Sequence, residues 1–200
     1  MSGRHRRPLT GVSLDAQVSR WGRPSRMIKS IQYGTVTIGT GGGPLTATAT
    51  IAAVVAANAV VHWFGESVEV AGVGTHGLNE SLSSVVITNP TTVTAQWGVN
   101  GGSNYATVEF MVVEYDPHVV KSNQAFSVAI TNTNASATAT ITAVNLAESI
   151  IAFGGFYTEG TVPLNAFATL KQTNATTVTG TRVGTSGALT LNGAVLELAA

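Results

Sequence analysis

The sequence predicts an all-β protein of the sandwich or small-barrel type, and three observations support that prediction. First, Thr, Val and Ile account for 62 of the 200 residues, and β-branched side chains favour strands over helices. Second, apolar and polar residues alternate with a period of two in stretches such as 47–51, as in a strand with one buried face. Third, turns rich in Gly and Asn separate these stretches at short intervals.

An internal repeat defines the individual strands. When the chain is laid against itself at offsets of roughly 83–92 residues, five blocks recur in the same order. They are residues 28–38 and 120–130, 47–54 and 137–144, 60–65 and 150–155, 88–94 and 173–179, and 111–115 and 194–198. The first two pairs are close to identical, and each block is predicted to form a strand.

Turns are predicted between these blocks, where the offset drifts and insertion is tolerated. The candidate turns are 39–44, 100–104, 132–134 and 184–187. The Gly-rich run 39–44 lacks the Lys-Ser/Thr pair and the helix start that a phosphate-binding loop needs, so we interpret it as a turn.

The repeat divides the chain into three parts. Residues 1–27 form an extended basic N-terminal arm, 28–116 a first small antiparallel β-sandwich or barrel-like domain, and 117–200 a second, homologous domain. A domain of this size buries only a little over ~60% of the surface that its unfolded chain exposes. We therefore expect the two tandem domains to dock on each other.

The charges are divided unevenly between the arm and the domains. Residues 1–30 contain seven Arg and Lys residues and one Asp, which gives a net charge of +6. The remaining 170 residues contain three Arg and Lys residues and nine Asp and Glu residues, which gives a net charge of −6. Pro and Gly interrupt the arm, which predicts an extended segment that orders only on an acidic partner. The residues expected to contact that partner are Arg4, Arg6, Arg7, Leu9, Val12, Leu14, Val18, Arg20, Trp21, Arg23 and Arg26.

Neither a signal peptide nor a membrane-spanning segment is expected. Polar residues interrupt the stretch after the basic start, which lacks the run of roughly 7–15 apolar residues of a signal peptide. The longest apolar run, Ile51 to Phe64, contains Asn58 and His62 and is shorter than the roughly 20 residues that span a bilayer.

The sequence carries no catalytic signature, so we expect neither enzyme activity nor a cofactor. There is no Cys, and no two of the four histidines have the spacing of a metal site. These histidines are His5, His62, His76 and His118, and His62 is expected at the surface or at a strand edge. One alternative stays open: Glu66 with Glu69, or Glu114 with Asp116, could act as acid and base in glycoside hydrolysis.

Exposed aromatic residues could bind sugars or protein partners. Trp63-Phe64 aligns with Phe153 in the repeat, which indicates a core position. Trp97 aligns with Arg182, so we expect an outward or peripheral side chain there. The tyrosines expected in loops are Tyr105 and Tyr157.

The blocks also resemble a known kind of module. Each unit runs from Lys-Ser-x-Gln through Ala-Thr-Ala-Thr-Ile-x-Ala-Val, an apolar strand ending in an aromatic residue and Gly, and Thr-Asn-x-Thr-Thr-Val-Thr to a closing strand such as Val-Val-Glu-Tyr. This order resembles the small β-sandwich modules of tailed-bacteriophage structural proteins, over about residues 28–200. The resemblance implies a virion structural role without enzyme activity. The arm lies outside it.

The sequence therefore favours a capsid decoration or cement protein in the virion, assembled in the host cytoplasm. Its partners would be viral structural proteins, a major capsid or a tail protein, and we expect a homo-oligomer, for which a trimer is one arrangement. A tail or fibre component that binds host glycan is the first alternative. Nucleic-acid binding through the arm is the second alternative. It is disfavoured because the domains carry a net charge of −6, which would repel a phosphate backbone, and because Trp21 is the only aromatic residue between the cations of the arm.

Overall fold

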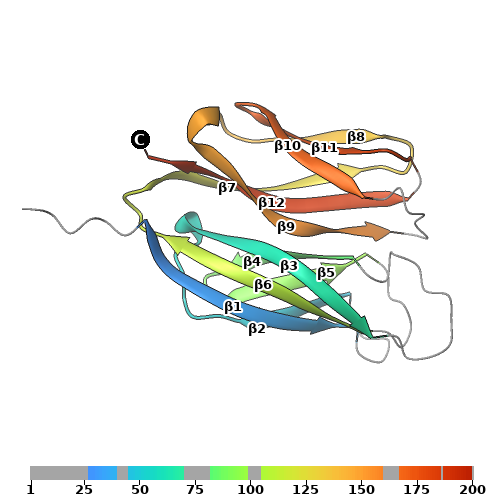
Figure 1. Ribbon diagram of the computed structural model, residues 1–200, viewed down its shortest axis with the longest axis horizontal. Coiled ribbons are helices and arrows are strands. Elements are labelled where there is room, and N and C mark those ends of the chain that lie inside the picture. Colours follow the sequence, from blue (N-terminus) through green and yellow to red (C-terminus); the bar gives the residue numbers. More distant parts are fainter. Residues whose placement is uncertain are drawn as a thin grey trace, which may run out of the picture.

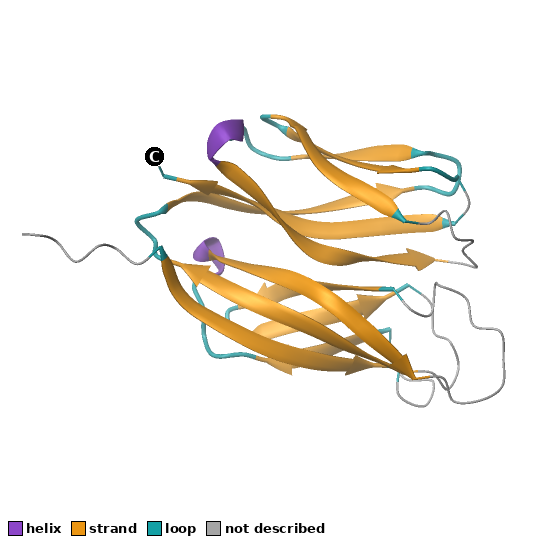
Figure 2. Cartoon of the chain, viewed as in Figure 1, coloured by secondary structure: helices purple, strands orange, loops and turns teal. Residues whose placement is uncertain are grey.

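The protein is built of antiparallel strands, as the sequence predicts. The structure is a computed structural model, and it describes residues 27–39, 45–69, 82–98, 105–159, 167–185 and 187–199. These residues form twelve strands and two single-turn 3₁₀ helices, η1 (Ala56–Asn58) and η3 (Leu146–Glu148) (Figure 2). The predicted all-β fold class is confirmed.

The first six strands form two three-stranded sheets that face each other. Their bounds are β1 Ile28–Ile38, β2 Thr46–Thr50, β3 Ala59–Glu69, β4 Ser83–Asn89, β5 Thr92–Trp97 and β6 Tyr105–Tyr115. One sheet has the order β1-β6-β3, and β5 lies between β2 and β4 in the other. We call this sandwich unit 1.

The second six strands repeat the arrangement. Their bounds are β7 Val120–Ile130, β8 Ser136–Thr140, β9 Ser149–Glu159, β10 Ala168–Asn174, β11 Thr177–Arg182 and β12 Ala188–Leu198. The sheets are β7-β12-β9 and β8-β11-β10, so each strand has the place and the length of the strand six numbers earlier. We call this sandwich unit 2. The chain passes between the units through residues 116–119, where the predicted boundary falls.

The two units are joined by more than the connection between β6 and β7. Ser84 of β4 pairs with Gly155 of β9, so one six-stranded sheet of order β2-β5-β4-β9-β12-β7 runs through both units. Figure 1 shows β9 and β12 lying along the side of unit 1 where β3 and β4 run. The expected docking of the two halves is present.

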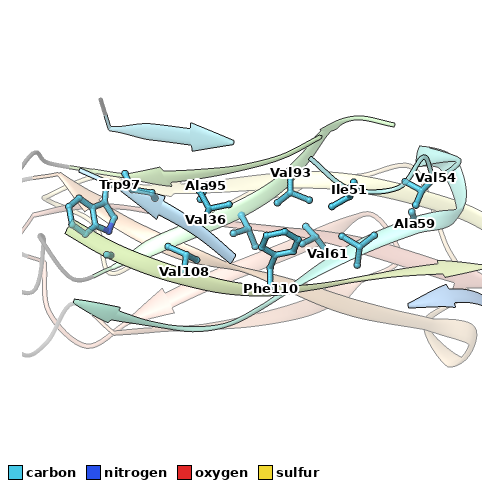
Figure 3. Packing of buried hydrophobic residues seen from close by; sticks show 14 residues of the cluster. Val36, Ile51, Val54, Ala59, Val61, Val93, Ala95, Trp97, Val108 and Phe110 are labelled. Atoms are coloured by element: carbon cyan, nitrogen blue, oxygen red, sulfur yellow. The ribbon is translucent and has the colours of Figure 1, made fainter. Parts of the chain in front are cut away.

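Each unit has its own apolar core between its two sheets. In unit 1 the inward residues of β1, β3, β5 and β6 meet around Phe110, and Ile51 and Val54 close one end (Figure 3). In unit 2, Ile141 and Val144 take the corresponding places. Ile51 and Ile141 are both buried, and each lies just after a short strand because β2 and β8 end at residues 50 and 140.

The blocks 88–94 and 173–179 are hairpins, so their prediction as single strands is wrong. Each block contains the end of one strand, a two-residue turn and the start of the next. The Asn89 side chain accepts hydrogen bonds from the backbone N–H and the hydroxyl of Thr91, and Asn174 accepts the same pair from Thr176. These turn contacts explain why Asn and Thr recur there.

Trp97 is buried, so the prediction of an outward side chain is wrong. It is 1% exposed at the end of β5, where its indole fills the end of the core. Its counterpart Arg182 is also buried, and its guanidinium donates to the carbonyl oxygens of Thr131, Asn134 and Gly187. An aromatic ring and a hydrogen-bonded guanidinium fill the same position in the two units.

Three further aromatic predictions are corrected in part. Trp63 and Phe153 pack against the cores as expected, but Phe64 is exposed because a β-bulge between Trp63 and Gly65 turns it outward. The tyrosines predicted in loops lie in strands, Tyr105 at the start of β6 and Tyr157 within β9.

Candidate functional site

The predicted partner-binding residues lie outside the described residues. This holds for the whole set Arg4, Arg6, Arg7, Leu9, Val12, Leu14, Val18, Arg20, Trp21, Arg23 and Arg26. The point where the arm joins the sandwich is described, because the carbonyl of Met27 accepts from the backbone N–H of Asp116 at 3.0 Å. The backbone N–H of Ala199 bonds to Val119 at 2.9 Å, so the arm and the C-terminal end both meet the connection between the units.

A buried carboxylate organises one end of unit 1. Glu114 on β6 accepts a 2.8 Å ion pair from Lys29, a 3.2 Å hydrogen bond from the Ser30 hydroxyl and a 2.9 Å bond from the Val55 backbone N–H. Gln32 bonds both backbone groups of Ala52. The Lys-Ser-x-Gln motif therefore ties the first strand to the last strand and to the segment that follows β2.

Unit 2 builds the same cluster. Glu197 accepts from Lys121 at 2.7 Å, from the Ser122 hydroxyl at 3.3 Å and from the Asn145 backbone N–H at 2.8 Å. Gln124 bonds the backbone of Thr142 in both directions. In both units the Lys, Ser, Gln and Glu side chains of the motif make contacts that hold strands and the neighbouring backbone together.

Both carboxylates are held in the charged form. Burial alone would raise the pKa of Glu114, but the bonds from Lys29, Val55 and Ser30 outweigh it and lower the pKa. The Lys121 ammonium and the Asn145 N–H lower the pKa of Glu197 against a smaller effect of burial. Each site therefore pairs a buried, hydrogen-bonded carboxylate with a lysine that is more than half exposed.

Glu66 is a different kind of carboxyl group. Both of its side-chain oxygens are enclosed within unit 1 and make no hydrogen bond of normal geometry. Burial raises the pKa of Glu66 from 4.5 to about 7, and the nearby Ser83 hydroxyl and Trp97 indole offset only part of that effect. Glu66 is thus a buried acid that ionises near neutral pH.

The members of each candidate acid–base pair have different surroundings. Glu66 is turned into the sandwich, whereas Glu69 is exposed and accepts a hydrogen bond from the Tyr105 hydroxyl. Glu114 is committed to its ion pair, and Asp116 accepts from the backbone N–H of His118 at 2.9 Å. These contacts place the members of each pair in separate environments.

The histidines that the structure describes are isolated from metal ligands. His62 is half-buried on the edge strand β3, and burial lowers its pKa; His118 lies in the connection between the units, while His5 and His76 are outside the described residues. In the described ranges no group of three or more His, Asp or Glu side chains could hold a metal ion. No helix in those same ranges is long and apolar enough to cross a membrane.

An aromatic surface that the sequence reasoning missed lies on the outer face of sheet β1-β6-β3. Tyr33 is 72% exposed and Phe64 54% exposed, and their ring centres are 6.3 Å apart. With Thr35 and Glu109 they line a surface hollow of about 350 Å³. A signal was present in the sequence, because the repeat has Ala125 and Gly154 where unit 1 has these two rings.

The fold and these contacts define a non-covalently stabilised, duplicated β-sandwich protein with one open aromatic face. Protein-family models, curated proteins and solved structures offer no match to this chain. Its function is therefore argued from its own residues.

Proposed function

We propose that the protein is a non-enzymatic virion structural protein, a capsid decoration or cement protein that the basic arm anchors to the shell. The observation that carries the proposal is the division of charge, +6 in residues 1–30 against −6 in the rest of a chain that is neutral overall. A cationic segment attached to a weakly acidic folded body is suited to join that body to an acidic surface.

The described sandwiches support a structural role through what their polar residues do. The repeated Lys, Ser, Gln and Glu residues hold strands together, as at Glu114 and Glu197. The exposed strand faces are rich in Thr, with pairs such as Thr88 and Thr94 bonded at 2.9 Å. A folded body that presents few charges suits dense packing against identical neighbours.

Anchoring through the arm needs many contacts rather than a few ion pairs. Ordering roughly 25 residues costs on the order of 1–2 kcal/mol each for the backbone, and a surface ion pair returns only ~0.2–1 kcal/mol. Apolar residues such as Leu9, Leu14 and Trp21 would fill pockets of the partner, while the neighbouring Arg residues make bidentate contacts with carboxylates.

The test is deletion of residues 2–25. The shortened chain is expected to unfold thermally as the full chain does, and to lose co-sedimentation with empty capsid shells. A matched variant with Arg4, Arg6, Arg7, Arg20, Arg23 and Arg26 replaced by Lys keeps the charge and removes the bidentate geometry, so it should bind the shell more weakly than the native chain.

Two results would contradict the proposal. Retained attachment after the deletion would transfer anchoring to the sandwiches. Binding of the full chain to duplex DNA with an affinity that falls steeply with salt, together with no binding to shells, would favour the nucleic-acid alternative.

A further inference from the structure

The two units contact each other edge on face. Unit 1 contributes the edge where β3, β4 and η1 lie, and unit 2 contributes the outer face of sheet β7-β12-β9. The Asn123 amide on that face donates to the carbonyl oxygens of Ala56 and Ala59 at 3.0 and 2.7 Å, and the Asn192 amide donates to the Ser84 hydroxyl at 2.8 Å. A small apolar cavity of about 180 Å³ remains between the two surfaces.

An edge-on-face contact between two units of the same topology uses two different surfaces. Each unit has both surfaces, and the contact within the chain uses the edge of unit 1 and the face of unit 2. The equivalent face of unit 1 and the equivalent edge of unit 2 are therefore left without this contact. We define the open face by Ile31, Tyr33, Phe64 and Glu109, and the open edge by Leu146, Ile150, Thr169 and Lys171. All eight correspond, at the offsets of the repeat, to residues in or beside the contact within the chain.

The glycines at the bulges show that a strand covers this point on the face of unit 2 and that no described strand covers it on the face of unit 1. Gly155 has φ +88°, and β4 crosses it so closely that a Cβ there would lie 2.5 Å from the Ser83 carbonyl oxygen. Its counterpart Gly65 has φ +123°, and a Cβ there would meet no atom of the described residues within 4 Å. The same backbone feature is thus covered in unit 2 and uncovered in unit 1.

Exposed apolar side chains stand at matching places on the two open surfaces. The Asn123–Ala56 contact within the chain corresponds to Ile31 on the open face and Leu146 on the open edge. Ile31 is 47% exposed and Leu146 is 50% exposed. A hydrogen bond inside the chain would become a contact between two apolar side chains if the same docking were repeated between chains.

The charges on the two open surfaces are complementary. Asn192 and its partner Ser84 correspond to Glu109 and Thr169, and Val86, beside the internal cavity, corresponds to Lys171. Glu109 and Lys171 are both exposed. Repeated docking would bring the Lys171 ammonium to the hollow that Tyr33 and Phe64 frame, next to the Glu109 carboxylate, where ring faces and a negative charge both favour a cation.

From these correspondences we infer that the open edge of one copy of this chain docks on the open face of another, and so repeats between chains the contact that joins the two units within a chain. The association is heterologous, because different surfaces meet. It closes into a ring where the rotation between successive units permits and otherwise extends into a filament. It does not require the arm, so it stands or falls separately from the anchoring proposal.

The open face carries larger side chains than the face of unit 2, and this difference affects how closely a docked edge can approach. Small residues of unit 2, such as Ala125, let the edge of unit 1 approach closely, whereas Tyr33 occupies that place in unit 1. The contact between chains would therefore be wider and more aromatic than the contact within the chain. Tyr33 and Phe64 are its expected centre.

The experiment is sedimentation velocity of the full chain over a range of concentrations. The native chain is expected to associate. Tyr33→Glu on the face and Leu146→Glu on the edge should each weaken association by at least about tenfold, since each places an unpaired charge in an apolar contact. Leu45→Glu is the matched control, because Leu45 is an exposed apolar residue on neither surface, and it should associate like the native chain.

A charge exchange makes the test specific for the pairing of these two surfaces. Glu109→Lys and Lys171→Glu should each weaken association, and the double variant should restore it to within about threefold of the native value. Deletion of residues 2–25 should leave association unchanged.

Several outcomes would overturn the inference. They are a native chain that stays monomeric at all concentrations, a Leu45→Glu variant as defective as Tyr33→Glu, or a double variant no better than the single ones. Loss of association on deletion of the arm would assign the open face to the arm. Binding of a glycan at Tyr33 by a chain that remains monomeric would assign it to sugar recognition.

Discussion

Glu66 illustrates how one side chain sets a pH dependence for the whole fold. Its oxygens are buried near the Ser83 hydroxyl and the Trp97 indole, and burial raises its pKa from 4.5 to about 7 although these two groups oppose the shift. Below pH 4.5 the group is protonated in the folded and the unfolded chain and contributes nothing. As the pH rises toward 7 the unfolded chain releases the proton first, so the free energy of unfolding falls, and above 7 the loss stays constant.

The prediction is that Glu66→Gln removes this loss. Between pH 4.5 and 8 the native protein should lose about 2–3 kcal/mol of unfolding free energy through Glu66, whereas the variant should lack this loss and be more stable than the native protein at pH 8. Denaturant unfolding at the two pH values measures the difference.

Glu69→Gln is the control, because Glu69 lies on the same strand and is exposed. It should keep the native slope. If Glu66→Gln leaves the pH dependence of the unfolding free energy unchanged, the pKa of Glu66 is not raised in the folded protein. The lowered pKa values of Glu114 and Glu197 act in the other direction: their stabilisation is complete above pH 4.5 and is lost as the pH falls through their folded pKa values, so this acid limb should be the same in both variants.

In each unit a Phe on one strand pairs with a Gly on the neighbouring strand, and the two units place the Phe on opposite strands of this pair. In unit 1, Gly34 on β1 pairs with Phe110 on β6, and the Phe110 ring fills the space over the glycine. In unit 2, Phe126 on β7 pairs with Gly193 on β12, so the ring comes from the other strand. In both units one Phe ring covers the glycine opposite it, although neither position carries the same residue in the aligned sequences.

This exchange predicts a compensating pair of substitutions. Phe110→Gly alone should cost about 3–5 kcal/mol through the cavity that it leaves, and Gly34→Phe alone should be destabilising because two rings would claim one space. The double variant Gly34→Phe/Phe110→Gly should recover more than half of the loss, because it recreates the arrangement of unit 2. Chemical denaturation of the three variants checks this, and additive losses in the double variant would refute it.

The sequence could predict most of the elements, and the misses have physical causes. The internal repeat predicted the full bounds of β1 and β7, because the blocks 28–38 and 120–130 coincide with these strands. The hairpins at 88–94 and 173–179 were missed because Thr has a high β propensity and conceals the turn that Asn89 and Asn174 direct. Trp97 was misplaced because its partner in the repeat is Arg182, whose guanidinium is buried by donating hydrogen bonds to backbone carbonyl oxygens and not by being apolar.

At the scale of the whole molecule, the contact between the units affects one of the two bulge glycines and not the other. Gly65 and Gly155 share a positive φ that L residues rarely adopt, so replacement by Ala carries a similar backbone cost of roughly 1–2 kcal/mol at each. At Gly155 the Cβ would also press on the backbone of β4, whereas at Gly65 it meets open space within the chain.

Gly155→Ala should therefore destabilise the protein more than Gly65→Ala, by at least about 1 kcal/mol, and should weaken the joint between the units. Thermal unfolding of dilute protein, where chains do not associate, gives the comparison. Equal losses of stability in the two variants would mean that β4 moves away from β9 without a measurable change in the free energy of unfolding.

The sequence by itself determined the fold class, the duplication, the repeated polar motif and the division of charge between the arm and the sandwiches, because these follow from residue type and from order along the chain. Only the tertiary structure decided that Lys29 and Glu114 meet, that Glu66 is enclosed, and that one unit rests its edge on the face of the other. The physical reason is that side-chain periodicity records which face of a strand is buried, whereas the identity of what buries it depends on contacts between residues far apart in the chain. Such contacts leave no periodic trace in the sequence.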